Sequence, residues 1–222
     1  MRVLSLFDGI STGFVVLQKL RLKVDKYFSS EIDENALRGQ RFHFHNQVIP
    51  VGCVTRLQDH EINEMGRIDL LIGGSPCQDL SLANPRRRGL HGECLYYEIK
   101  VYMCKCSFSD PTLPPQGDNS TGKLFFEYVR ILKQLQMNAK KYGFNLFWLF
   151  ENTAAMEVHT RQEISEYVLI ALGALSVSYC YASLFTFQVP WLRSIKDLLI
   201  CICANETTSI LLGQYSYNEQ VA

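Results

Sequence analysis

The stretch IDLLIGGSPCQDLS, residues 68–81, joins a continuous apolar run to a turn of small and polar residues that carries a cysteine. A short apolar run of this kind is typical of a strand buried on both faces of a sheet. Other predicted strands precede it at residues 2–6, 24–31 and 47–54, and helical patterns separate the strands at residues 14–20, 34–44 and 59–67. Strands that alternate with helices predict an α/β fold with a doubly wound, mostly parallel sheet, whose ligands bind beyond the carboxyl ends of the strands.

The alternation stops at Glu93 and resumes near Gly122 with a predicted helix at 123–143, a strand at 145–152 and a helix at 161–172. A length of 222 residues predicts one domain, residues 1–222, with a sizeable core. Residues 167–192 contain no charged side chain, but their serines, tyrosines and Pro190 favour a buried strand pair over a membrane span. The tail beyond residue 204 shows no pattern that predicts structure.

Composition sets limits on the function. The formal net charge is zero, so binding to nucleic acid would require a local basic patch rather than whole-chain attraction. The eight cysteines are irregularly spaced without a C-x-x-C pair, which favours neither a disulfide framework nor a metal site. Asp8 interrupts the first apolar run, so the sequence predicts no signal peptide.

The turn LFDGISTG, residues 6–13, follows the first predicted strand and opens a helix. Its glycines, Gly9 and Gly13, allow a tight turn and a close approach of a ligand to the backbone. Glu31 ends the next strand, where an acidic residue typically binds the ribose hydroxyls of an adenosine-containing cofactor. The alternative is a turn with a structural role only.

Cys77 follows Pro76 in the turn after the fourth strand, where a doubly wound sheet places its active site. The hypothesis is a nucleophilic thiolate, and the alternative is an inert, packed thiol. The arginines at residues 86–88 would lower the pKa of a nearby thiol or bind phosphates; the alternative is a solvated loop.

Glu151 and Asn152 end the apolar strand FWLF. A carboxylate in this position is partly desolvated, so it can hold a proton near neutral pH. The alternative is that Asn152 or Thr153 caps the helix that follows.

The motifs FDGISTG, SEID, IDLLIGGSPCQDLS and FWLFEN occur in the order and approximate spacing of the DNA (cytosine-5)-methyltransferase family, which the chain resembles. The segments NPRRRGL and LFFEY are similar to the animal de novo branch. The resemblance spans Val3 to about Leu90 and Gly122 to about Tyr167. It implies a class I S-adenosylmethionine-dependent methyltransferase fold (Rossmann-like), with residues 93–121 as an insertion loop and 168–222 as a divergent C-terminal segment that lacks the family's Q-x-R-x-R motif.

The resemblance implies a function: methyl transfer from S-adenosylmethionine to carbon 5 of cytosine in DNA. Cys77 would add to carbon 6 of a flipped cytosine, and Glu151 would hydrogen-bond or protonate nitrogen 3. Pro76 would shape the nucleophile loop and Asn152 would hold it in place. The implied contacts with the cofactor are Phe7, Asp8, Gly9, Ile10, Thr12, Glu31, Ile32, Cys53, which stands where the family usually has an aspartate, and Leu124.

The implied partners are DNA and either a homologous methyltransferase or a second copy of the chain, with no membrane, and the implied location is the nucleus. Two alternatives stay open. The first is a catalytically inactive methyltransferase-like partner protein. The second is a small-molecule methyltransferase of the same fold, which would not need the Pro76–Cys77 and Glu151–Asn152 pairs.

Overall fold

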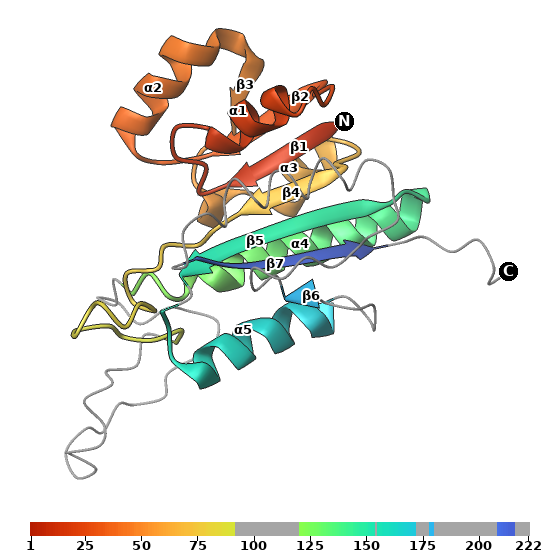
Figure 1. Ribbon diagram of the computed structural model, residues 1–222. Coiled ribbons are helices and arrows are strands. Elements are labelled where there is room, and N and C mark those ends of the chain that lie inside the picture. The colour runs from red at the N-terminus through yellow and green to blue at the C-terminus, as the bar shows by residue number, and fades with distance from the viewer. Residues whose placement is uncertain (92–119, 154, 172–177, 180–207, 216–222) are drawn as a thin grey trace, which may run out of the picture.

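The computed structural model describes residues 1–91, 120–153, 155–171, 178–179 and 208–215. Its described strands form one seven-stranded sheet of order β3-β2-β1-β4-β5-β7-β6 (Figure 1). Neighbours among the first five strands pair in parallel, and β7 pairs antiparallel with β5 and with β6. The bounds are β1 Arg2–Leu6, β2 Lys26–Ser30, β3 Val48–Pro50, β4 Leu70–Gly73, β5 Leu146–Thr153, β6 Ser178–Tyr179 and β7 Thr208–Tyr215. The predicted α/β, mostly parallel sheet is confirmed.

Helices cover both faces of this sheet. They are α1 Thr12–Lys19, α2 Glu34–Phe44, α3 Asp59–Glu64, α4 Leu124–Tyr142 and α5 Val158–Ala171, with short 3₁₀ helices η1 His45–Gln47 and η2 Val54–Arg56. Val3 of β1 packs with Phe14 of α1, whereas Leu4 belongs to the core that includes α3, α4 and α5. Because successive strand residues point to opposite faces, both faces of β1 are buried, and its sequence is therefore almost continuously apolar.

The third strand is shorter than predicted. The sequence indicated residues 47–54, but β3 ends at Pro50 and η2 begins at Val54. Gly52 has φ +78°, a left-handed conformation that extended pairing does not allow, and Cys53 already precedes the first residue of η2. Apolar composition extended the prediction beyond the point where the backbone turns.

Two predictions concern segments that the structure describes only in part. Most of 93–121 lies outside the described residues, as does most of the strand pair predicted within 167–192. The two described residues of β6 lie in this second range, and their partner is β7. The tail, where the sequence indicated nothing, therefore contributes the strand that extends the sheet past β5. Among the residues described, no helix has the length and apolarity needed to cross a membrane.

Candidate active site

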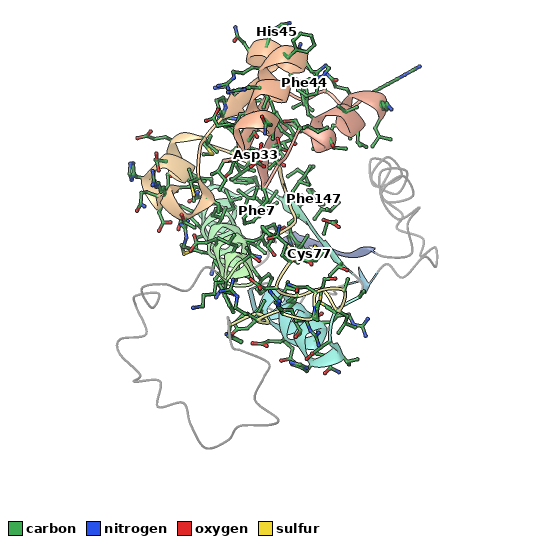
Figure 2. The ribbon with its side chains drawn as sticks, turned by 90° about the vertical axis from the view of Figure 1, so that its left-hand side faces the viewer. Phe7, Asp33, Phe44, His45, Cys77 and Phe147 are labelled. Atoms are coloured by element: carbon green, nitrogen blue, oxygen red, sulfur yellow. The ribbon has the colours of Figure 1, made fainter. Side chains whose placement is uncertain are left out.

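Strand register brings four predicted site segments to one edge of the sheet. Leu6, the last residue of β1, pairs with Ser30 of β2 and with Gly73 of β4, and Gly73 pairs with Phe150 of β5. The residues that follow in sequence are Phe7, Glu31, Gly74 and Glu151. The chain therefore leaves β1, β2 and β4 at the level of Glu151, while β5 continues to Thr153. In Figure 1 the arrows of β1, β4 and β5 point to this edge, and Figure 2 views the molecule from that side, with Phe7, Asp33 and Cys77 labelled.

The turn between β1 and α1 has an uncommon backbone. Phe7 and Ser11 have φ values of +55° and +61°, and Gly9 between them has +58°. A left-handed conformation costs a non-glycine residue on the order of 1–3 kcal/mol, and it persists only where the surroundings impose it. Such strain concentrates at functional sites. The residues that contact this turn are therefore the ones that hold it in its strained conformation.

Asp8 shapes the turn from inside. One carboxylate oxygen accepts hydrogen bonds from Ser5 Oγ at 2.6 Å and Tyr27 Oη at 2.7 Å. The other accepts from Ser11 Oγ at 2.6 Å and Gln40 Nε2 at 3.3 Å. Four donors nearly exhaust what a carboxylate accepts, so this side chain fixes the turn and has little capacity left for a ligand.

Glu31, which directly follows β2, binds the backbone of the same turn. Its Oε2 accepts from the Gly9 N–H at 2.7 Å, and its Oε1 accepts from the N–H groups of Ile32 and Asp33 at 2.7 and 2.8 Å. Three backbone donors orient the carboxylate, and a carboxylate has about four acceptor sites. Acceptor capacity therefore remains for one hydroxyl group of a ligand.

Two large apolar side chains lie exposed beside Glu31. Ile10 is 61% exposed and Ile32 is 69% exposed. Both follow the carboxyl ends of strands, where an adenine ring could bury them. Thr12, the first residue of α1, is exposed, and Leu124, the first residue of α4, is half-buried. Cys53 Sγ lies 3.1 Å from Thr55 Oγ1.

Cys77 is exposed at the start of a compact turn. Its carbonyl oxygen accepts from the N–H groups of Leu80 at 2.9 Å and Ser81 at 2.8 Å. On β5, Asn152 donates from Nδ2 to the Ser75 carbonyl at 3.0 Å and to Ser75 Oγ at 3.3 Å. This buried amide ties the loop that carries Pro76 and Cys77 to the neighbouring strand.

Glu151 lies directly against the start of that loop. A Cβ atom on Gly74 would lie 2.6 Å from Glu151 Oε2 and 2.7 Å from the Glu151 carbonyl oxygen. Only glycine therefore allows this approach. Burial raises the pKa of the Glu151 carboxyl above its ordinary value. Among the described residues, none donates a hydrogen bond to this carboxylate, so it is free to act on a ligand.

The helix-cap alternative for Asn152 and Thr153 is wrong, because α5 begins only at Val158. The solvated-loop alternative does not fit the whole arginine triplet. Arg87 forms an ion pair with Glu157, and Arg88 Nε lies 3.3 Å from Asp79 Oδ1. These two guanidinium groups have internal partners, and the solvated-loop alternative fits Arg86, which is exposed.

Sequence reasoning missed two polar residues that organise the site. Gln40 is 3% exposed and donates from Nε2 to the Gly9 carbonyl at 2.7 Å and Ser29 Oγ at 2.9 Å. Asp79 is 5% exposed and accepts hydrogen bonds from Thr121. Their partners are distant in sequence, so no local pattern could identify them, although a glutamine within an amphipathic helix was a weak signal.

Comparison with known proteins gives consistent matches. Residues 1–105 match the family model of the C-5 cytosine-specific DNA methylases. The chain is 28% identical over 162 residues to the orphan methyltransferase M.SPRI of Bacillus phage SPR, a match that covers 72% of the chain and 28% of that protein. It is 32% identical over 154 residues to the DNA (cytosine-5)-methyltransferase DRM1 of Arabidopsis thaliana, covering 63% of the chain and 20% of that protein. The chain thus spans between a fifth and a third of the length of these relatives.

Solved structures agree on the fold. A Spodoptera frugiperda DNMT2 variant has a TM-score of 0.55 at 14% identity and covers 99% of the chain, which spans 51% of that protein. The Schizosaccharomyces pombe Dnmt2 methyltransferase has a TM-score of 0.53 at 14% identity, with 99% and 50% covered. The predicted class I methyltransferase fold is confirmed.

Proposed function

Because the chain belongs to the C-5 cytosine-specific DNA methylase family, we propose that it transfers a methyl group from S-adenosylmethionine to carbon 5 of cytosine in DNA. One observation carries the proposal: the register that places Phe7, Glu31, Gly74 and Glu151 at one level of the sheet edge. The turn after β1, the loop that carries Cys77 and the partly buried Glu151 carboxyl therefore all belong to the carboxyl edge of the sheet.

The residues at this edge fit S-adenosylmethionine. Glu31 retains acceptor capacity for a ribose hydroxyl, and the exposed Ile10 and Ile32 side chains would be covered by an adenine ring. The backbone of the turn at Phe7 and Gly9 would face the amino-acid end. When bound, the cofactor supplies an electrophilic methyl group.

The loop after β4 and the strand β5 supply the other reacting groups. The Cys77 thiolate adds to carbon 6 of the cytosine ring, and the Glu151 carboxyl donates a proton or hydrogen bond to nitrogen 3 as the electron pair moves to carbon 5. Carbon 5 would then bond to the methyl carbon as the bond from that carbon to the cofactor's sulfur breaks, leaving S-adenosylhomocysteine. Loss of the proton on carbon 5 to a base expels the thiolate and restores the ring. The raised pKa of Glu151 keeps a larger fraction of this carboxyl protonated at a given pH.

DNA as the substrate rests on the family match, and a cytosine in a duplex must leave the stack to reach Cys77. A nuclear location and pairing with a homologous methyltransferase or with a second copy are further parts of the proposal. They rest on the sequence resemblance alone.

The alternative of a catalytically inactive partner is favoured by one observation. Cys53 occupies the place where the resemblance indicates an aspartate that receives the adenine amino group, and its thiol already lies 3.1 Å from Thr55 Oγ1. A thiol is a weak acceptor, so adenine is bound less tightly than by a carboxylate. A chain that binds neither cofactor nor DNA productively but binds an active homologue would support this alternative.

The test is methyl transfer from labelled S-adenosylmethionine to a cytosine-containing duplex, with 5-methylcytosine identified by mass spectrometry of the nucleosides. We expect Cys77→Ser to abolish transfer and Glu151→Gln to reduce it by about 10²–10⁴-fold, the range for loss of a general acid. Glu166→Gln makes the same change at an exposed position of α5 and is the matched control. 5-Methylcytosine that still forms with Cys77→Ser would contradict the covalent mechanism.

A further inference from the structure

Asp79 lies two positions after Cys77 and is 5% exposed. Its Oδ2 accepts hydrogen bonds from the Thr121 N–H at 2.6 Å and from Thr121 Oγ1 at 3.0 Å, while Oδ1 accepts from Arg88 Nε at 3.3 Å. Buried carboxylates are costly unless they are paired in this way. The carboxylate therefore joins segments that are 9 and 42 residues away in sequence.

The backbone reinforces the same junction. The Asp79 carbonyl oxygen accepts from the Gly89 N–H at 2.8 Å. A Cβ atom on Gly122 would lie only 2.1 Å from the Gly89 carbonyl oxygen, so these two glycines are packed backbone against backbone. The turn of Cys77, the loop at 84–91 and the residues that lead into α4 thus meet at one buried carboxylate.

We infer that Asp79 is a positioning residue that fixes the turn of Cys77 against the start of α4. The turn is short and closed by hydrogen bonds onto the Cys77 carbonyl oxygen, so a displacement of Asp79 is transmitted to the Cys77 backbone. At the other end of the junction, α4 begins at Leu124, a predicted contact with the cofactor. The Asp79 carboxylate thus fixes the position of Cys77 relative to the residues at the start of α4. This inference deepens the proposed function, and its importance for catalysis rests on that function.

The junction requires a carboxylate rather than an amide. Both oxygens of Asp79 accept, and the Asn side chain has only one acceptor atom. Asp79→Asn therefore sets an N–H₂ group against either the Thr121 donors or the Arg88 guanidinium. Burial alone would raise the pKa of Asp79, but the hydrogen bonds from Thr121 and the Arg88 charge outweigh it and hold the pKa below its ordinary value, so the group is ionised at neutral pH.

The first experiment measures the alkylation rate of Cys77 by iodoacetamide from pH 6 to 10, with the modified peptide identified by mass spectrometry. It needs no methyl transfer, so it separates failure of this inference from failure of the proposed function. We expect Asp79→Asn to change the Cys77 rate by at least threefold at constant fold, judged by circular dichroism. Asp59→Asn, an exposed aspartate of α3, is the matched control. An unchanged Cys77 rate and pH profile in Asp79→Asn would overturn the inference.

The second experiment measures single-turnover methyl transfer and S-adenosylhomocysteine binding. We expect Asp79→Asn to slow transfer by about 10–100-fold, because misplacing a reacting group by about 1 Å costs about 10²-fold, with the Kd changed by much less. Thr121→Val removes only one hydrogen bond and keeps the N–H, so it serves if Asp79→Asn does not fold. We expect it to slow transfer by about threefold to tenfold, since one hydrogen bond contributes about 0.5–1.5 kcal/mol. Wild-type transfer by folded Thr121→Val, or an equal loss of binding and transfer, would contradict a positioning role.

Discussion

Replacing Gly74 with alanine tests the approach of Glu151 to the nucleophile loop. The added Cβ would lie 2.7 Å from the Glu151 carbonyl oxygen, whereas ordinary contact begins at 3.4 Å, so the two backbones must separate by about 0.7 Å. Overpacking of this kind typically costs about 1–3 kcal/mol. For a chain of this length, we expect a fall in Tm of about 2–12 °C.

The same displacement moves the Glu151 carboxyl relative to Cys77. We expect methyl transfer to fall by about 10²-fold, the effect of a misplacement near 1 Å. Urea unfolding gives the stability, and single-turnover transfer gives the activity. Gly39→Ala is the matched control: its Cβ meets only Ile10 Cγ2, at 3.7 Å, and alanine inside α2 favours the helix by about 1 kcal/mol.

Testing Gly74→Ala in a chain that also carries Glu151→Ala distinguishes the two contacts that the added Cβ would make. Glu151→Ala removes the carboxylate oxygen at 2.6 Å but leaves the carbonyl oxygen at 2.7 Å. We therefore expect Gly74→Ala to stay destabilising in the Glu151→Ala chain. A cost that vanishes in this background, or a Gly74→Ala chain within about 0.5 kcal/mol of the wild type, would refute the steric reasoning.

Three further predictions address other parts of the molecule. Gln40→Met keeps the side-chain volume but leaves the Gly9 carbonyl without its buried donor, so S-adenosylhomocysteine should bind about tenfold more weakly by calorimetry; unchanged affinity would show that the turn does not need this contact. Glu151→Gln should raise Tm at pH 8 but not at pH 4. Burial raises the pKa of Glu151 in the folded state, so ionisation of this carboxyl destabilises the fold at high pH, whereas below the ordinary pKa of 4.5 it is protonated in both states and there is no penalty to remove. A Tm gain at both pH values would point to a cause other than ionisation. Replacing residues 93–119 by about six glycine and serine residues should leave Tm unchanged or slightly higher. Gly89 and Gly122, which flank the segment, are already in contact, and a shorter loop closes at lower entropic cost. A large fall in Tm would show that the replaced residues support the core.

The strands and helices up to α5 could be predicted because each carries its own pattern. β1 and β4 are apolar runs of the buried parallel kind, and α4 has a long amphipathic period that ends at Gly143, which has φ +68°. β7 could not be predicted in this way. Its only local signal is a short apolar run, and its place depends on pairing with β5, more than 50 residues earlier in the chain.

The candidate site likewise contains residues that a local pattern predicts and residues whose role depends on distant partners. Cys77 and Glu151 could be placed at the carboxyl edge because each directly follows an apolar strand. The function of Asp8 as a buried acceptor for the turn could not, since its donors Tyr27 and Gln40 come from β2 and α2. The internal pairing of Arg87 with Glu157 was likewise hidden, because the two residues are 70 positions apart.

The most direct measurement is covalent trapping on a duplex that contains 5-fluorocytosine, with S-adenosylmethionine present and the linked peptide sequenced by mass spectrometry. Fluorine at carbon 5 cannot leave as a cation, so the enzyme stays attached to the base after methyl transfer. We predict a single protein–DNA adduct whose attachment point is Cys77. An adduct through any other residue, or no adduct from chain that calorimetry shows to bind both cofactor and duplex, would contradict the mechanism.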